Sequence, residues 1–306
     1  MTTDHVAPTA LDAVTVLAWD EPPSAAEVAA RVAAATARSV GDPMTPAALV
    51  AVVDLTTLEG SDTADRVTRL GRQAAEPADD DPSLGPAAAV CVYPSLVPAA
   101  VAATAGTPVG VASVAGAFPS AQSPLPVRLA DIATAAAAGA DEIDIVLNRS
   151  AFLAGDLTTV TGDLVASIAA AGGRPVKVIL EVGELVTPEA VHTAALLAMA
   201  AGAAFVKTST GKIPAGATPE AVAVMTAAAE RFGAETGRPV GVKVSGGVRS
   251  HTDAALYGAI VAGRDADPYP GPDRFRIGAS GLLDALVAAH RDLGSGGARP
   301  TPADGS

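Results

Sequence analysis

The chain has 306 residues, of which 49% are hydrophobic and 17% are charged, so it can bury a large core as an ordered globular protein. Its formal net charge of −13 argues against nucleic acid and against anionic membrane surfaces as partners, because both bind to basic faces. Cys91 is its single cysteine, which excludes an intrachain disulfide and any cysteine-cluster metal site.

The N-terminal part is expected to be irregular up to residue 22 and then helical. Ser24 and Glu27 have the spacing of a capping box at the start of a short helix. The first residues show neither the basic segment nor the apolar segment of a secretory signal, so a cytoplasmic protein is expected.

Eight short runs of apolar and β-branched residues follow the helix. They predict strands at 48–58, 87–94, 109–118, 142–147, 176–182, 204–210, 240–246 and 275–280. Alanine-rich segments long enough for helices separate them, for example 129–140 and 188–203. Residues 82–127 carry no charge, but their prolines and glycines leave no apolar span of about 20 residues for a transmembrane helix.

Strands that alternate with helices predict a parallel sheet of the α/β class. Eight β–α units over about 240 residues match a (β/α)8 TIM barrel. A doubly wound sheet is the alternative, but VVDLTTL (52–58) lacks the glycine-rich dinucleotide turn typical of its first strand. We therefore expect an N-terminal helical extension at 1–46, a barrel at 47–292 and a disordered tail at 293–306.

Charged residues interrupt several apolar strands of the predicted barrel. Asp144, Lys207 and Lys243 lie in EIDIVL, AFVKTST and VGVKVSG, respectively. Active sites of such barrels lie at the C-terminal strand ends, and residues of one parity face the lumen. Glu142 and Lys177 come early in their strands, so we expect them to form a salt bridge near the barrel floor.

Lys207 and Lys243 fall at similar depth on neighbouring strands. Two unit charges about 4 Å apart repel by about 4 kcal/mol at an effective dielectric constant near 20, which lowers one lysine pKa by up to about 3 units from about 10.4. Burial acts in the same direction, and Asp144 offsets part of the effect. We expect one lysine to titrate at about pH 7 to 8 and the other to stay cationic, which suits a Schiff-base nucleophile.

Glycine-rich turns follow the last three strands: TSTGK (208–212), SGGVR (245–249) and GASG (278–281). Their backbone N–H groups can bind an anion, and Lys212 and Arg249 add positive charge. A P-loop is excluded because Val206 and Ile213 stand where it needs glycine and a hydroxyl. The substrate should therefore carry a carbonyl and a phosphate. The histidines show no metal-ligand spacing, and no metal or cofactor is expected.

The motifs together resemble the deoxyribose-phosphate aldolase family of class I aldolases, in order and at the family's spacing from about residue 48 to 290. The blocks that carry the resemblance are VDLTTL (53–58), VCVYP (90–94), ADEIDIVLN (140–148), VKVILEVGEL (176–185), FVKTSTGK (205–212), VGVKVSGGVR (240–249) and RIGASGLL (276–283).

The resemblance implies a TIM-barrel enzyme of deoxynucleoside catabolism that cleaves 2-deoxy-D-ribose 5-phosphate reversibly into acetaldehyde and D-glyceraldehyde 3-phosphate. It assigns the Schiff base to Lys207, the lowering of that lysine's pKa to Lys243, and proton transfer to Asp144. It implies small phosphorylated sugar and aldehyde substrates and a monomer or homodimer. The residues it places at the substrate are Asp54, Thr208, Gly211, Lys212, Gly246, Gly247, Arg249, Gly278 and Ser280.

Three segments depart from the family pattern. Gly281 replaces a second serine of the phosphate loop, and Val244 and Ser245 replace the residues expected after the lysine of the seventh strand. The block AGAFPSAQSP (115–124) lacks the expected sequence after the third strand. The first 40 or so residues have no counterpart.

Two other functions stay open at this point. One is a Schiff-base aldolase for a longer ketose phosphate, suggested by the altered block at 115–124. The other is a non-catalytic barrel that binds sugar phosphates as a sensor or scaffold, suggested by Gly281 and the N-terminal segment. Cys91 is expected to be a buried structural thiol.

Overall fold

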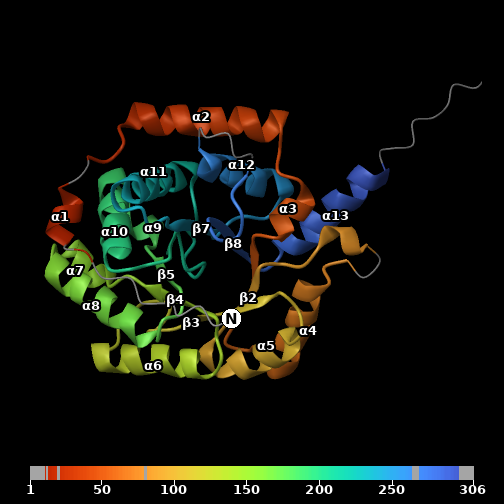
Figure 1. Ribbon diagram of the computed structural model, residues 1–306, viewed down its shortest axis with the longest axis horizontal. Coiled ribbons are helices and arrows are strands. Elements are labelled where there is room, and N and C mark those ends of the chain that lie inside the picture. The colour runs from red at the N-terminus through yellow and green to blue at the C-terminus, as the bar shows by residue number, and fades with distance from the viewer. Residues whose placement is uncertain (1–10, 12, 19–20, 79–80, 264–268, 296–306) are drawn as a thin grey trace, which may run out of the picture.

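The structure is a computed structural model that describes residues 11, 13–18, 21–78, 81–263 and 269–295. Within these residues eight parallel strands pair in chain order, and the last pairs with the first, so the sheet closes into a barrel (Figure 1). The predicted TIM barrel is confirmed. The strands are β1 (Val53–Thr56), β2 (Ala89–Val92), β3 (Gly110–Val114), β4 (Glu142–Val146), β5 (Val176–Ile179), β6 (Phe205–Lys207), β7 (Gly241–Ser245) and β8 (Phe275–Ala279).

Alternation along the strands separates two buried environments. In β1, Val53 and Leu55 belong to the main apolar core, whereas Asp54 between them joins the charged side chains of the lumen. In β6, Val206 belongs to the same core, whereas Lys207 faces the lumen charges. The apolar layer between barrel and helices stabilises the fold, and the lumen is left for polar groups.

Helices cover the outside of the barrel. The longer ones are α4 (Ala64–Ala75), α5 (Val97–Thr104), α6 (Leu125–Ala137), α8 (Leu157–Ala170), α10 (Pro188–Ala200), α11 (Pro219–Thr236), α12 (His251–Ala262) and α13 (Leu282–Ser295). Short helical turns are η1 (Pro82–Leu84), η2 (Pro94–Leu96), α7 (Arg149–Leu153) and α9 (Val182–Leu185). None of the helices within the described ranges combines the length and the apolar character needed to span a bilayer.

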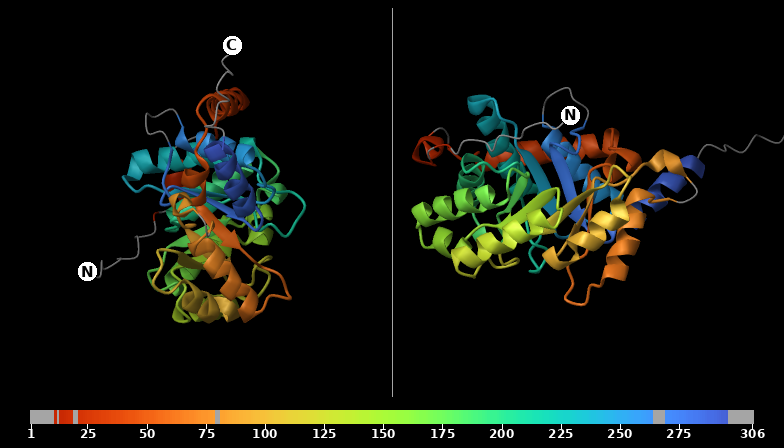
Figure 2. Two further views of the ribbon diagram at one scale, coloured as in Figure 1. Left: turned by 90° about the vertical axis from the view of Figure 1, so that its right-hand side faces the viewer. Right: turned by 60° about the horizontal axis from the view of Figure 1, so that its bottom comes forward.

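The N-terminal segment contributes α1 (Ala13–Leu17), α2 (Ala25–Gly41) and α3 (Pro46–Val50). The capping box of Ser24 and Glu27 is present, as expected, but the helix it begins has 17 residues and is longer than predicted. It lies on the outer side of α11 and α12 (Figures 1 and 2).

Residues 46–50 form α3, so the prediction that the first strand begins at 48 is wrong. Thr45 caps this helix through its side chain and Pro46 occupies its first turn, which together favour a helical start over an extended one. The domain limits at 46 and 292 stay predictions. Of the expected disordered tail, residues 296–306 lie outside the described residues, while α13 continues to Ser295.

Candidate active site

The barrel lumen brings the three predicted catalytic side chains together. Lys207 and Lys243 are register partners on β6 and β7, and both ammonium groups donate to the same atom, Oδ2 of Asp144 on β4. The distances are 2.7 Å from Nζ of Lys207 and 2.8 Å from Nζ of Lys243. All three side chains are buried. The geometry expected from strand order is therefore present.

The two lysines have opposite pKa shifts. Burial is the main cause that lowers the pKa of Lys207 below its usual range, and repulsion by Lys243 adds to it, although Asp144 acts in the other direction. Burial also disfavours the charged form of Lys243, but Asp144 and Asp54 outweigh it and hold the pKa of that lysine above its usual range. Lys207 is thus the lysine inclined to be neutral, as predicted, with burial as a larger cause than the neighbouring charge.

Lys177 pairs with Glu142, as the sequence predicted, and it also reaches the catalytic cluster. Its Nζ lies 3.1 Å from Oδ1 of Asp144, the oxygen that the other two lysines do not use. Burial favours the neutral acid, but Lys177, Lys207 and Lys243 together keep the pKa of Asp144 well below its usual range. Asp144 is therefore a carboxylate with both oxygens occupied by amines.

Arg276 on β8 completes the cluster and was not predicted. Its Nη1 donates to Oδ1 of Asp54, and its Nη2 lies 2.9 Å from Oε1 of Glu142. The other oxygen of Asp54 accepts from Lys243. Asp54 was expected near the substrate hydroxyls, but it is fully buried with both oxygens bound. The signal for Arg276 was its position in FRIGAS, where it shares the lumen-facing parity of the other charged residues.

The lumen cluster contains more basic groups than acidic ones. Three carboxylates face four basic side chains: Asp54, Glu142 and Asp144 against Lys177, Lys207, Lys243 and Arg276. If Lys207 is the neutral member, charges within the cluster balance, and a buried cluster is least costly when each ion has a partner.

A cavity of about 570 Å³ opens beside Lys207 at the C-terminal ends of the strands. Seven of the predicted substrate residues line it: Gly211, Lys212, Gly246, Gly247, Arg249, Gly278 and Ser280. Four further residues line the cavity and were not predicted: Thr56 of β1, Thr57 and Glu59 of the segment after it, and Arg66 of α4. The site therefore joins an amine of lowered pKa to a polar cavity rich in glycine.

Thr208 does not line this cavity, although it was expected near the substrate. Its Oγ1 donates to the carbonyl of Ser245 at 3.0 Å and accepts the amide of Ser245 at 2.9 Å, which ties the end of β6 to the end of β7. Ser245 adds a bond from its own hydroxyl to the carbonyl of Ser209. This serine departs from the family pattern, and its hydroxyl joins the two turns that carry the glycines.

Thr210 and Glu181 hold the turn after β6 from below. Glu181 is fully buried and has a left-handed backbone with a φ of 59°. Its carboxylate accepts from the amide of Thr210 at 3.2 Å, from the hydroxyl of Thr210, and from Nη1 of Arg149 at 3.2 Å. Nearby, Gly216 approaches the Gly246 backbone so closely that a Cβ on Gly216 would meet the carbonyl oxygen of Gly246 at 2.4 Å. These contacts fix the turn after β6 against the turn after β7.

The segment after β3 lies against the opposite side of the barrel mouth. Asp131 accepts from the amides of Gly116 at 2.8 Å and Ala117 at 3.3 Å, and the ring of Phe118 packs edge-on against Tyr93. Phe118 also packs on the apolar side chains at the ends of β4 and β5. Cys91 is buried as expected, and burial raises the pKa of its thiol.

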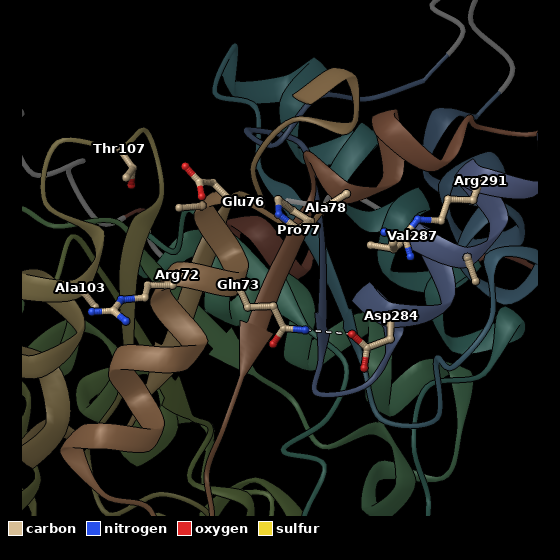
Figure 3. A pocket seen from close by; sticks show the side chains of 12 residues that line it. Arg72, Gln73, Glu76, Pro77, Ala78, Ala103, Thr107, Asp284, Val287 and Arg291 are labelled. Carbon is tan, nitrogen blue, oxygen red and sulfur yellow. Dashed lines mark hydrogen bonds between the residues drawn. The ribbon is translucent and has the colours of Figure 1, made fainter. Parts of the chain in front are cut away.

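A second cavity, of about 1050 Å³, lies outside the barrel between α4 and α13 (Figure 3). Its lining mixes Arg72, Arg291, Glu76 and Asp284, and Gln73 donates to Asp284 across it at 2.9 Å. No lysine and no buried acid lies on this surface. Among the described residues, no group of three or more His, Cys, Asp or Glu side chains is arranged to hold a metal ion. This second cavity therefore lacks the buried lysine and carboxylate found beside the first one.

Comparison with known proteins shows the family to which this chain belongs. A sequence profile of the DeoC/LacD family of aldolases matches residues 48–284. The deoxyribose-phosphate aldolase of Homo sapiens is 41% identical over 247 residues, which cover 78% of this chain and 78% of that protein. The deoxyribose-phosphate aldolase of Mus musculus is 42% identical over 248 residues, with the same coverage of both chains.

A solved structure with the same architecture is the deoxyribose phosphate aldolase from Aeropyrum pernix, which is described as a tetramer. It is 28% identical to this chain, with a TM-score of 0.66, and the match covers 87% of this chain and 98% of that one. The region before residue 48 lies outside the family match.

Proposed function

Because the chain belongs to the DeoC/LacD family of aldolases, we propose that it is a deoxyribose-phosphate aldolase, a carbon–carbon lyase that cleaves 2-deoxy-D-ribose 5-phosphate reversibly into acetaldehyde and D-glyceraldehyde 3-phosphate. The observation that carries the proposal is the shared carboxylate: Lys207 and Lys243 both contact Asp144 beside a cavity lined by glycine turns. We place the reaction in deoxynucleoside catabolism.

In the proposed mechanism the neutral amine of Lys207 attacks the C1 aldehyde of the open-chain sugar, and loss of water gives an imine. Once it is protonated on nitrogen, the imine accepts the electron pair of the C2–C3 bond, while a base removes the proton of the C3 hydroxyl. Glyceraldehyde 3-phosphate leaves, and the remaining enamine takes a proton at C2 before water releases acetaldehyde and the free amine. Asp144 is the proposed base and proton carrier, since its carboxylate lies 2.7 Å from Nζ of Lys207 and the lysines around it keep it ionised.

The remaining site residues have roles in binding or in positioning. Lys212 and Arg249 supply positive charge for the phosphate, and the backbone N–H groups of the glycine turns supply hydrogen bonds. Lys243 stays cationic, repels a charge on Lys207 and orients Asp144. Asp54 orients Lys243 from below instead of contacting substrate hydroxyls, and Thr208 joins the two turns.

The test is to incubate the protein with acetaldehyde and borohydride and to locate the modified peptide by mass spectrometry. We expect one reduced two-carbon adduct on Lys207 and none on Lys177, Lys212 or Lys243. The variant Lys207→Leu is the control and should take up no adduct. An unmodified Lys207, or an adduct on another lysine, would contradict the proposal. Turnover of fructose and sedoheptulose phosphates is measured beside turnover of 2-deoxyribose 5-phosphate. Faster turnover of the ketose phosphates would indicate an aldolase for longer ketose phosphates instead.

We further propose that the protein is a monomer or a homodimer and that it is located in the cytoplasm. The net charge of −13 favours a small assembly, because like charges repel when many copies associate. The Aeropyrum pernix relative is a tetramer, so light scattering, which should give the mass of one or two chains, separates the two possibilities. The cytoplasm suits a charged sugar phosphate, which a bilayer retains.

A further inference from the structure

Arg66 lines the same cavity as Lys212, Arg249 and Ser280, although no sequence motif pointed to it. It lies in the first turn of α4, directly after the segment that follows β1. Because β1 pairs with β8 to close the barrel, this segment comes next to the turn of Gly278–Gly281. Closure of the barrel therefore brings the guanidinium of Arg66 next to the glycine turn after β8, although the two are more than 200 residues apart in the sequence.

Asp62 orients the guanidinium of Arg66. The Asp62 carboxylate accepts from Oγ1 of Thr57 at 2.8 Å and from the amide of Glu59 at 2.8 Å, and its side chain is 1% exposed. Nε of Arg66 lies 3.2 Å from Oδ1 of this fixed carboxylate. Within the described chain, Nη1 and Nη2 of Arg66 have no carboxylate or hydrogen-bond partner. An arginine held by Nε retains the two terminal nitrogens, which can bind an oxyanion side by side.

The cations of this cavity differ in how their charge is balanced. Lys212 has its Nζ 3.1 Å from Oε1 of Glu59, which itself lines the cavity. A phosphate bound by Lys212 must therefore replace Glu59 or lie beside it. Asp62, the partner of Arg66, instead accepts hydrogen bonds from Thr57 and from the amide of Glu59, so Asp62 need not move when a phosphate binds. At Gly281, no atom lies within 4 Å of an added Cβ, which leaves room for an anion at this rim.

We propose that Arg66 is a phosphate-binding residue of the active site, which donates from Nη1 and Nη2 to the terminal phosphate of the substrate, with Asp62 as its positioning residue. The inference deepens the proposed function and rests on it for the identity of the ligand as a sugar phosphate. A phosphate monoester carries about −1.5 to −2 charges near neutral pH. Lys212 and Arg249 would then contact it from the turns after β6 and β7, and Arg66 from the start of α4.

The experiment compares Arg66→Gln with Arg69→Gln, which removes an exposed arginine three residues further along the same helix. Binding of inorganic phosphate is measured by calorimetry, and kcat/KM is measured for 2-deoxyribose 5-phosphate and for unphosphorylated 2-deoxyribose. We expect Arg66→Gln to weaken phosphate binding about tenfold and to reduce the preference for the phosphorylated sugar by a similar factor, since a charge-assisted hydrogen bond is lost. Arg69→Gln should leave both quantities unchanged.

Two further variants make each outcome decisive. Asp62→Ala should weaken phosphate binding less than Arg66→Gln does, because the arginine remains but is no longer oriented; unchanged binding would remove the positioning role. Lys212→Gln serves as a reference for the proposed phosphate site. If Lys212→Gln weakens phosphate binding and Arg66→Gln does not, the inference on Arg66 is wrong while the proposed function stands. If the unmodified protein binds phosphate through Arg66 but forms no adduct on Lys207, the proposed function fails and the binding role of Arg66 remains.

Discussion

Lys207 differs from the other basic groups of the lumen in the number of carboxylates it contacts. Lys207 contacts Asp144 alone, whereas Lys243 contacts Asp54 and Asp144. Lys177 contacts three carboxylates, and Arg276 contacts two. Because each nearby carboxylate favours the charged form of an amine, the group with a single contact loses its proton first. The choice of Lys207 as the proposed nucleophile therefore depends on its contacts and not on residue type.

Lys243→Gln tests this difference, since glutamine can still donate to carboxylates but carries no charge. Removal of the charge ends the repulsion that lowers the pKa of Lys207, so that pKa should rise. The rate of borohydride trapping by acetaldehyde, measured against pH, should then reach its midpoint at a higher pH than in the unmodified protein. Lys212→Gln should leave the midpoint in place. A midpoint that stays fixed, or moves to lower pH, in Lys243→Gln would contradict the assigned role.

Strand β7 shows how an element is adapted to the lumen cluster. Gly241 begins this strand opposite Phe205 of β6, and a Cβ at Gly241 would meet ring atoms of Phe205 at 2.2 to 2.8 Å. The ring lies beside Lys177 and Arg276, with centroid distances of 6.0 and 5.8 Å to the charged groups. Phe205 therefore closes the lumen below the ions, and glycine makes room for its ring.

Two glycine-to-alanine changes should act in opposite directions. Gly241→Ala forces the buried Phe205 ring to move and should destabilise the protein by about 1–3 kcal/mol, the usual cost of overpacking. Gly162→Ala in α8 has open space around the added methyl and should stabilise it by about 0.5–1 kcal/mol through helix propensity. The free energy of unfolding in urea measures both. A neutral or stabilising Gly241→Ala would show that the ring is not confined.

The alternation of strands with helices along the chain could be predicted from the sequence. All eight strands were predicted, because buried parallel strands are short apolar runs between helical segments. The exception was 46–50, where Thr45 and Pro46 start α3 within a run that also reads as apolar strand. The turns after β6, β7 and β8 were predicted to lie together, and they line one cavity. The sequence did not predict that Glu181 accepts hydrogen bonds from the turn after β6, because this contact joins residues that are distant along the chain.

The molecule as a whole carries a buried ionic cluster at its centre, and its stability should depend on pH for this reason. Burial favours the neutral acid at Asp54, but Lys243, Lys177 and Arg276 outweigh it and keep the pKa of Asp54 far below its usual range. An acid with a lower pKa in the folded state stabilises the fold fully above its unfolded pKa of about 3.9, and this contribution is lost as pH falls toward the folded pKa.

Asp54→Asn should therefore be destabilising in a pH-dependent way. Near pH 7 it leaves buried cations without their carboxylate, at a cost of about 3–5 kcal/mol. Below about pH 4 the difference from the unmodified protein should narrow, because Asp54 of the unfolded chain takes up a proton there while the folded carboxylate stays ionised, which favours unfolding of the unmodified protein. Urea unfolding between pH 3 and 7 measures the difference, with Asp65→Asn on the surface of α4 as a control. A difference that is constant across this range would show that the charge of Asp54 does not stabilise the fold.

The barrel, the depth of Asp144, Lys207 and Lys243 in their strands, and the glycine turns could be predicted from the sequence, because each depends on local alternation and on strand order. The family resemblance pointed to Lys207 as the lysine of lowered pKa, but the contacts that cause this shift are seen only in the tertiary structure. The tertiary structure also places Asp54 in the ionic cluster, where it accepts from Lys243. It also brought Arg66 to the cavity and Arg276 to Asp54. These contacts join β1 to β8, the two ends of the barrel in sequence, and the distances between them exist only once the sheet has closed.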